Sequence, residues 1–176
     1  GELEKAYDAF SKALQQAPNN ARAWYGRGIA LSASDQHSRA VSSLRRAVAL
    51  EPKNPDYLAD LACAISGAGS TNVAAEVEQT FLKALAAAPK HARAEYLTAV
   101  FYDEQGQLPK AIAHYRHALE LEPDNPRGKL LLATCYLKSG QQAAGEMLLK
   151  ELVTRGSKGD AIHERAKALL EKSAKP

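Results

Sequence analysis

The chain has 176 residues, of which 45% are hydrophobic and 24% are charged, and its formal net charge is +3. These values are typical of a folded domain and exclude a highly charged disordered chain. The basic residues are interspersed with acidic ones, and no apolar run approaches the roughly 20 residues that a membrane-spanning helix needs. We therefore expect neither a nucleic-acid partner nor direct insertion of this part of the chain into a membrane.

Helical segments that end at a proline recur along the chain. Pro18, Pro52, Pro89 and Pro123 lie 34, 37 and 34 residues apart. Upstream of each proline, small and large apolar residues recur on one helical face, in three columns: Ala6, Ala40, Val77 and Ala111; Phe10, Leu44, Phe81 and Tyr115; and Ala13, Ala47, Ala84 and Ala118. The columns predict repeated pairs of helices, of which these segments are the second members.

Residues 1–20 have the pattern of a second helix without a first helix before it. We therefore expect the chain to be a fragment that begins inside a repeat. The apolar residues of this segment form one stripe: Leu3, Ala6, Tyr7, Phe10 and Leu14. An uncovered stripe of this kind favours self-association, so we expect either that another copy of the chain covers it or that it remains an exposed end that tends to associate.

Four complete helix pairs follow, over residues 21–54, 55–91, 92–125 and 126–157, and residues 158–176 form a capping helix and tail. The first helices carry small residues, such as Gly28, Ala99 and Ala133, which allow the two backbones of a pair to approach closely. Gly106 and Gly140 fall at the expected turns, and Asp160 can cap the last helix. The sequence thus predicts a single all-α domain over residues 1–176.

The spacing resembles that of the tetratricopeptide repeat (TPR) family, whose 34-residue unit has a Trp, a Gly and an aromatic in its first helix and Ala, Phe and Pro columns in its second. The best match consists of Trp24, Gly28, Leu31, Ala40, Leu44, Ala47 and Pro52. The resemblance implies a right-handed superhelical solenoid of antiparallel helix pairs, with about four and a half repeats and a C-terminal cap. Three positions depart from the pattern: Glu95 in the Trp column, Gly145 in an Ala column and Ser157 in the Pro column.

The sequence contains no glycine-rich phosphate loop, nucleophile elbow or paired-cysteine motif, so we expect no enzymatic activity and no cofactor. His114 and His117 lie three residues apart on a helix and could bind a metal ion, with His91 in a nearby turn, but a third ligand is not evident. We expect a solvated surface pair instead, and no metal site. Cys63 and Cys135 lie two repeats apart, which predicts two thiols without a disulfide.

The family resemblance implies that the first helices line a concave groove, which binds a protein or peptide partner. The residues expected to face this groove are Arg22, Tyr25, Ile29, Asp60, Cys63, Arg93, Tyr96, Val100, Arg127, Leu130 and Thr134. The three arginines share one column and either bind carboxylates of the partner or are simply solvated. Chaperone-binding members of the family have an Asn where this chain has Ile29, Cys63, Val100 and Thr134, so the resemblance favours a partly apolar ligand.

The 37-residue repeat places its three extra residues between its two helices, in a segment that contains Gly67, Gly69, Ser70 and Asn72. This loop is either neutral variation or a lip that contacts the partner. The lengthening after LADLACAI, together with the ARAW opening, looks like the TPR domains of bacterial cytochrome c maturation proteins, which hold the C-terminal helix of apocytochrome in the periplasm.

Three functions remain compatible with the sequence. The first is a scaffold that binds a partner segment in its groove during the assembly or chaperoning of a complex. The second is an interaction or regulatory domain of a larger enzyme, such as a glycosyltransferase. The third is a self-assembling platform built through the N-terminal helix. The location of the protein, in the cytoplasm or the bacterial periplasm, stays open.

Overall fold

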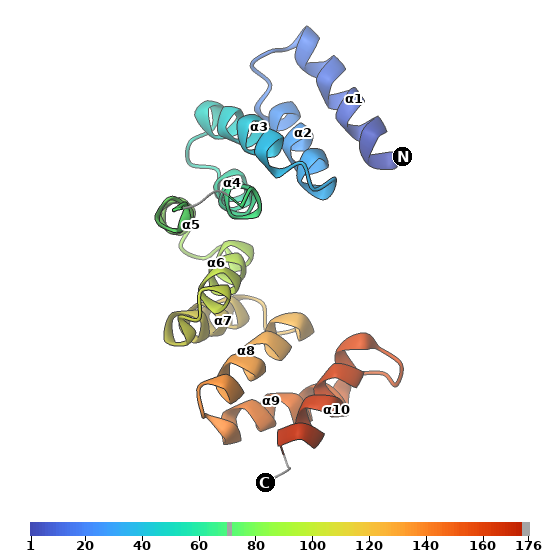
Figure 1. Ribbon diagram of the computed structural model, residues 1–176, viewed down its shortest axis with the longest axis vertical. Helices are drawn as coiled ribbons and strands as arrows, with labels where there is room; N and C mark the ends of the chain where they lie inside the picture. The colour runs from blue at the N-terminus through green and yellow to red at the C-terminus, as the bar shows by residue number, and fades with distance from the viewer. Residues whose placement is uncertain (70–71, 174–176) are drawn as a thin grey trace. The chain divides into compact units, whose positions relative to one another are not determined.

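The computed structural model describes residues 1–69 and 72–173, and these residues form ten α-helices and no strand (Figure 1). The helices are α1 (Glu2–Gln16), α2 (Ala21–Ala33), α3 (His37–Leu50), α4 (Pro55–Gly67), α5 (Ala74–Ala87), α6 (Ala92–Glu104), α7 (Leu108–Leu121), α8 (Pro126–Lys138), α9 (Gln142–Arg155) and α10 (Ala161–Ser173). The predicted all-α class and the four helix pairs α2–α3, α4–α5, α6–α7 and α8–α9 are confirmed. Within the described residues, none of the helices combines the length and the hydrophobicity that are needed to span a bilayer.

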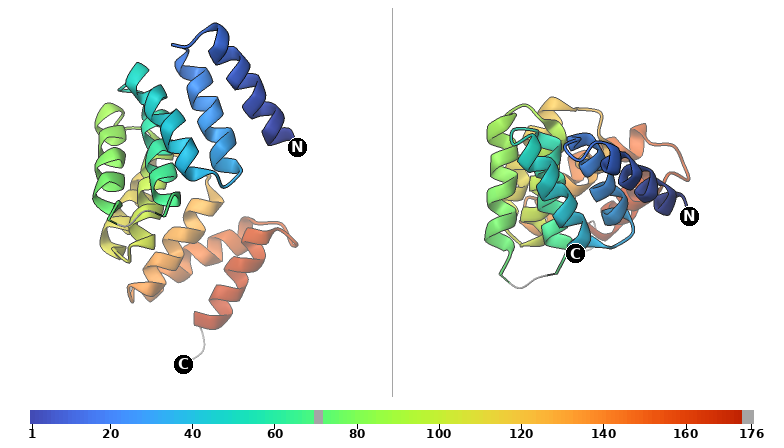
Figure 2. Two further views of the ribbon diagram at one scale, coloured as in Figure 1. Left: turned by 45° about the horizontal axis from the view of Figure 1, so that its top comes forward. Right: turned by 90° about the horizontal axis from the view of Figure 1, so that it is seen from above.

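The chain consists of two compact units, Gly1–Lys90 and His91–Pro176. In unit 1 each helix packs against the next one from α1 through α5, and in unit 2 each helix packs against the next one from α6 through α10. Neighbouring helices within a unit run side by side in antiparallel pairs (Figure 2). The boundary between the units lies next to the predicted start of the third complete repeat.

Polar side chains cap the N-termini of the first helices, and a glycine lies just after the C-terminus of two of these helices. The side chains of Asn20, Asn54 and Asn125 each accept a hydrogen bond from a backbone N–H in the first turn of the helix that follows. Gly106 and Gly140 adopt φ angles of 69° and 78°, a region that glycine enters without steric cost. These residues fix the short turns that make successive helices antiparallel.

Close contacts between small and large side chains hold each pair together. A Cβ atom on Gly28 would lie 2.6 Å from Leu44 Cγ of the partner helix, so only glycine fits there. Ala40 and Ala111 are completely buried in the corresponding second helices. The small-residue columns therefore mark the contacts between helices, as predicted.

The stripe on α1 is less exposed than predicted. The ring of Phe10 lies against Gly26 of α2, where a Cβ atom would come within 2.3 Å of the ring, and Leu14 is buried. Leu3 is 44% exposed. Gly26 provides the space that lets α1 pack on α2, so the expectation of a fully uncovered stripe is wrong.

The C-terminal helix α10 begins as predicted, because Asp160 Oδ2 accepts a hydrogen bond from the backbone N–H of His163. Its buried residues are His163, which the sequence pattern did not single out, and Ala166, whereas Ala161 is exposed.

Replacing Ala111 by Leu is expected to lower the free energy of unfolding by about 1–3 kcal/mol, because the larger side chain overpacks a fully buried contact between helices. Urea denaturation followed by circular dichroism measures the change. Ala113→Leu is the matched control, since Ala113 is exposed on the same helix. Equal stability of the two variants would contradict the role given to the small-residue column.

Candidate functional site in the two helical stacks

Unit 1 contains a hollow of about 580 Å³ between α1, α2 and the start of α4. Its walls are mainly apolar and include Leu3 and Phe10 of α1 and Tyr25 and Ile29 of α2. Arg22 also lines the hollow and makes no hydrogen bond or ion pair with the described residues. The structure thus brings together Arg22, Tyr25 and Ile29, the three groove residues predicted in the first complete repeat.

A network beneath this hollow joins α2 to α4. The ring of Tyr25 stacks on that of Tyr57 with their centroids 4.6 Å apart, and the Tyr25 hydroxyl donates a hydrogen bond of 2.7 Å to Asp60 Oδ2. Asp60 is 8% exposed, so this predicted groove residue supports Tyr25 from below. Burial and the carboxylate of Glu51 raise the pKa of Tyr57, against the opposing charge of Arg22. Tyr57 therefore stays neutral at the edge of the hollow.

A smaller hollow of about 220 Å³ lies in unit 2 between α6, α7 and the start of α8. Arg93 and Tyr96 line it, and their predicted role in binding a partner stays a prediction. The rings of Tyr96 and Tyr115 meet edge to face at 5.9 Å, and burial raises the pKa of Tyr96 although the positive charge of Arg127 opposes the shift. Arg127 therefore acts electrostatically on this hollow without lining it.

The same pair of residue types lines both hollows. Arg22 and Tyr25 are separated from Arg93 and Tyr96 by 71 residues, and each pair occupies the same positions of a first helix. The second complete repeat has Asp56 and Ala59 there, and Ala59 is fully buried. An Arg-x-x-Tyr pair beside a hollow is thus found once in each unit.

The other predicted groove residues lie outside the two hollows. Cys63 and Val100 are half-buried on α4 and α6. Leu130 packs against the core cluster around Leu149, and the Thr134 hydroxyl donates a hydrogen bond of 2.8 Å to the Leu130 carbonyl. Leu130 therefore contributes to packing, which the sequence pattern did not indicate.

The histidine pair of α7 is held by a buried carboxylate. His114 Nδ1 lies 2.7 Å from Glu95 Oε2, and His117 Nδ1 lies 2.8 Å from Glu95 Oε1. Glu95 is only 4% exposed, and the His114 ring stacks on Tyr102. The pair is thus only partly solvated, with side chains 24% and 45% exposed, and its shared bond to Glu95 was not expected. The signal was present in the sequence, because Glu95 occupies the column that normally holds an aromatic residue.

The next hairpin has an ion pair at the same positions. Lys129 Nζ lies 2.8 Å from Glu151 Oε1, and this hydrogen bond lowers the pKa of Glu151. Glu95 and His117 are 22 residues apart, as are Lys129 and Glu151. The acidic residue therefore lies on the first helix, α6, in one hairpin and on the second helix, α9, in the other. Among the described residues no group of three His, Cys, Asp or Glu side chains is arranged to hold a metal ion.

The cysteines and the long turn complete the predicted features. Both Cys63 and Cys135 remain outside any disulfide in the described part of the chain, as predicted. In the turn after α4, Gly69 and Asn72 have positive φ angles, and Ser70 lies outside the described residues. A contact between this turn and a partner stays a prediction.

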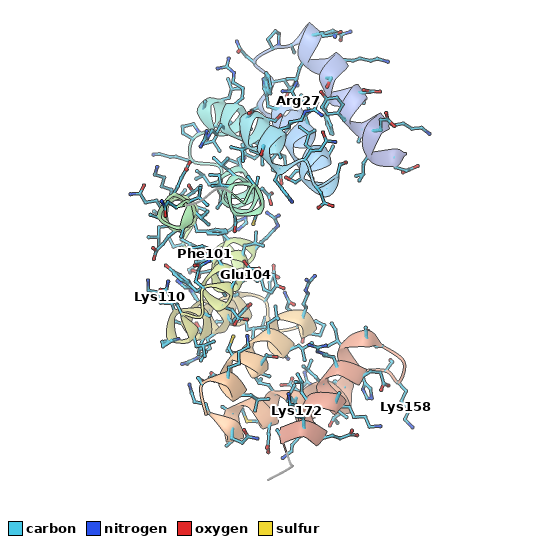
Figure 3. The ribbon with its side chains drawn as sticks, in the orientation of Figure 1. Arg27, Phe101, Glu104, Lys110, Lys158 and Lys172 are labelled. Carbon is cyan, nitrogen blue, oxygen red and sulfur yellow. The ribbon has the colours of Figure 1, made fainter. Side chains whose placement is uncertain are left out.

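Glu95→Ala is expected to lower the free energy of unfolding by about 2 kcal/mol, because it leaves two imidazoles without their shared acceptor. Chemical denaturation measures this loss. Glu104→Ala is the control on the same helix, since Glu104 is exposed (Figure 3). A loss no greater than that of the control would show that Glu95 does not hold α6 to α7.

Burial, reinforced by the nearby Asp103, raises the pKa of the Cys135 thiol to about 12. The thiolate is therefore scarce below that pH, and we expect Cys135 to resist alkylation at pH 8. Labelling of a Cys63→Ser variant with iodoacetamide, followed by mass spectrometry, isolates Cys135. The thiol should react only after denaturant is added, and rapid labelling of the folded protein would contradict its burial.

The family pattern of the "Cytochrome c-type biogenesis protein H TPR domain" matches residues 1–127, and a general "Tetratricopeptide repeat" pattern matches residues 104–172. The BBSome complex member bbs-4 of Caenorhabditis elegans is 31% identical over 150 residues, which cover 82% of this chain and 32% of that protein. Cellulose synthase operon protein C of Pseudomonas fluorescens (strain SBW25) is 27% identical over 175 residues, 93% of this chain and 13% of that protein. The chain thus spans a third or less of these curated relatives.

Solved structures of TPR proteins share the fold. A thermophilic TPR protein of Thermus thermophilus superposes with a TM-score of 0.81 at 20% identity, covering 96% of this chain and 91% of that one. PilW, a type IV pilus biogenesis factor, gives a TM-score of 0.80 at 24% identity, with coverages of 98% and 81%. The helix pairs, the repeat columns and these matches together show that the chain is a TPR scaffold and belongs to the family of cytochrome c-type biogenesis protein H TPR domains.

Proposed function

We propose that the chain binds a segment of a client polypeptide in the hollow of unit 1, as a step in the assembly of c-type cytochromes. The observation that carries the proposal is the hollow itself, which combines apolar walls from Leu3, Phe10 and Ile29 with the guanidinium of Arg22. Such a surface fits the apolar face of a helical segment better than a strongly charged tail. The match to the cytochrome c-type biogenesis family, which covers the whole of unit 1, supports this choice of client.

In this proposal the remaining predicted residues have supporting roles. Asp60 fixes the Tyr25 ring through its hydroxyl, and Arg93 and Tyr96 form a second, smaller contact in unit 2. Arg127 adds positive charge beside Tyr96, whereas Cys63, Val100, Leu130 and Thr134 contribute less to binding. The chain has no reaction of its own and acts by holding the client segment.

The test uses a synthetic peptide with the sequence of the C-terminal helix of an apocytochrome c, and a scrambled peptide as its control. Ile29→Ala should weaken binding by about 5–10-fold in isothermal titration calorimetry, because it removes apolar contact area from the hollow. Val100→Ala is the matched variant, since Val100 lies 71 residues later at the same repeat position but outside both hollows. Binding of the scrambled peptide with equal affinity, or equal losses in the two variants, would refute the proposal.

Self-association is the second candidate, favoured by the exposure of Leu3 at the edge of the same hollow. A second copy that placed its own α1 there would cover Leu3 and compete with the peptide. Sedimentation equilibrium over a range of concentrations, with and without the peptide, separates the two functions. A mass that doubles with concentration and falls when peptide is added would favour self-association through the hollow.

A further inference from the structure

A third hollow, of about 340 Å³, lies in unit 2 between the second helices α7 and α9, with α8 as its floor. We call it the α7–α9 hollow, and the residues that matter to the argument are Arg116, Leu119 and Glu120 of α7, Leu132 of α8, and Met147 and Leu148 of α9. It shares only Leu119 with the hollow beside Tyr96. The client-binding proposal does not use it.

The α7–α9 hollow lies on the other side of α8 from the predicted groove. Its floor includes Leu132 and Tyr136, four residues apart, whereas the predicted groove residues Leu130 and Thr134 are offset from them by two positions. Because an α-helix turns by about 100° per residue, an offset of two residues points the two pairs in nearly opposite directions. A partner in this hollow would therefore contact neither Leu130 nor Thr134.

The walls of the hollow consist mainly of apolar side chains, and one of these side chains is unusually exposed. Met147 is 66% exposed, more than any other large hydrophobic side chain in the described residues. Leu119 on α7 and Leu148 on α9 are only half-buried. An exposed methionine beside a partly apolar hollow is typical of a surface that binds a partner, because its flexible thioether side chain adapts to different apolar groups.

The charged residues of the hollow narrow the choice of partner. Arg116 and Glu120 are exposed one helical turn apart on α7, and neither forms a hydrogen bond or ion pair with the described residues. Lys129, which also lines the hollow, is already paired with Glu151. Arg116 and Glu120 together carry no net charge and Lys129 is already paired, so the hollow offers no cluster of unpaired cations for the phosphates of nucleic acid or anionic lipid.

We propose that the α7–α9 hollow is a second docking site that takes an amphipathic helix of a partner protein. Large apolar side chains of that helix enter between Leu119 and Met147. An acidic residue and a basic residue, one turn apart on the edge of the helix that faces α7, pair with Arg116 and Glu120. Because this site shares no residue with the hollow of unit 1, the scaffold can hold a partner at each of the two sites at once.

The probe is a phage-displayed library of helical peptides with two fixed leucines four residues apart and randomised residues along one edge. It is selected separately against the wild-type chain and against the charge-swapped variant Arg116→Glu/Glu120→Arg. Peptides enriched on the wild type should carry an acid and a base on that edge, and the order should reverse on the variant. Enrichment of the same charges on both proteins, or no enrichment, would overturn the proposal.

Single substitutions locate the bound peptides. Met147→Glu should weaken the peptide selected on the wild type by about 10-fold or more, as expected for the loss of a central apolar contact. Leu82→Glu, at a 47% exposed leucine of α5, is the matched control and should change the affinity less than about 2-fold. Ile29→Ala should also leave the affinity unchanged, because Ile29 lines the hollow of unit 1 and not the α7–α9 hollow. Loss of binding in Ile29→Ala, or none in Met147→Glu, would place the peptides elsewhere.

Discussion

The close approach of paired helices at small side chains is the constraint on which the rest of the structure depends. Leu44 occupies the space that a side chain on Gly28 would need, and Ala40 and Ala111 are fully buried at corresponding contacts. Since each pair is held through these contacts, the outward faces of its helices need not contribute to the core. Those faces can therefore carry Arg22 and Ile29 on one helix and Met147 on another without loss of stability.

Polar contacts between successive first helices complement this packing. The Tyr25 hydroxyl bonds to Asp60, and Lys138 Nζ lies 2.8 Å from Asp103 Oδ1; in both cases the two residues are 35 positions apart. One contact joins α2 to α4 in unit 1 and the other joins α6 to α8 in unit 2. Each therefore fixes the spacing of neighbouring first helices where side chains are available to a ligand.

Much of the fold could be predicted from the sequence, because small and large apolar residues recur with the repeat period. The size of these residues determines where they can pack. The proline spacing and the alanine columns located the helix pairs α2–α3, α4–α5 and α6–α7, and the repeat length placed α8–α9, although Gly145 and Ser157 replace the alanine and the proline there. The Arg-x-x-Tyr residues were predicted to face a groove, and in the structure they line hollows. Contacts that depend on three-dimensional neighbours could not be predicted. Glu95 was noticed as a departure, but its bonds to His114 and His117 depend on the hairpin geometry. The contact between the Phe10 ring and Gly26 likewise depends on how α1 packs against α2.

The reversal of charge between the two hairpins of unit 2 has a consequence for chain assembly. Helix α6 brings an acid to α7, and α8 brings a base to α9, at equivalent positions. If α6 instead paired with α9, Glu95 would face Glu151, and two carboxylates would share one poorly solvated contact. Repeats of similar sequence are prone to exchange helices as they fold, and this arrangement penalises that exchange electrostatically. The two contacts thus distinguish the α6–α7 pair from the α8–α9 pair in an otherwise repetitive array.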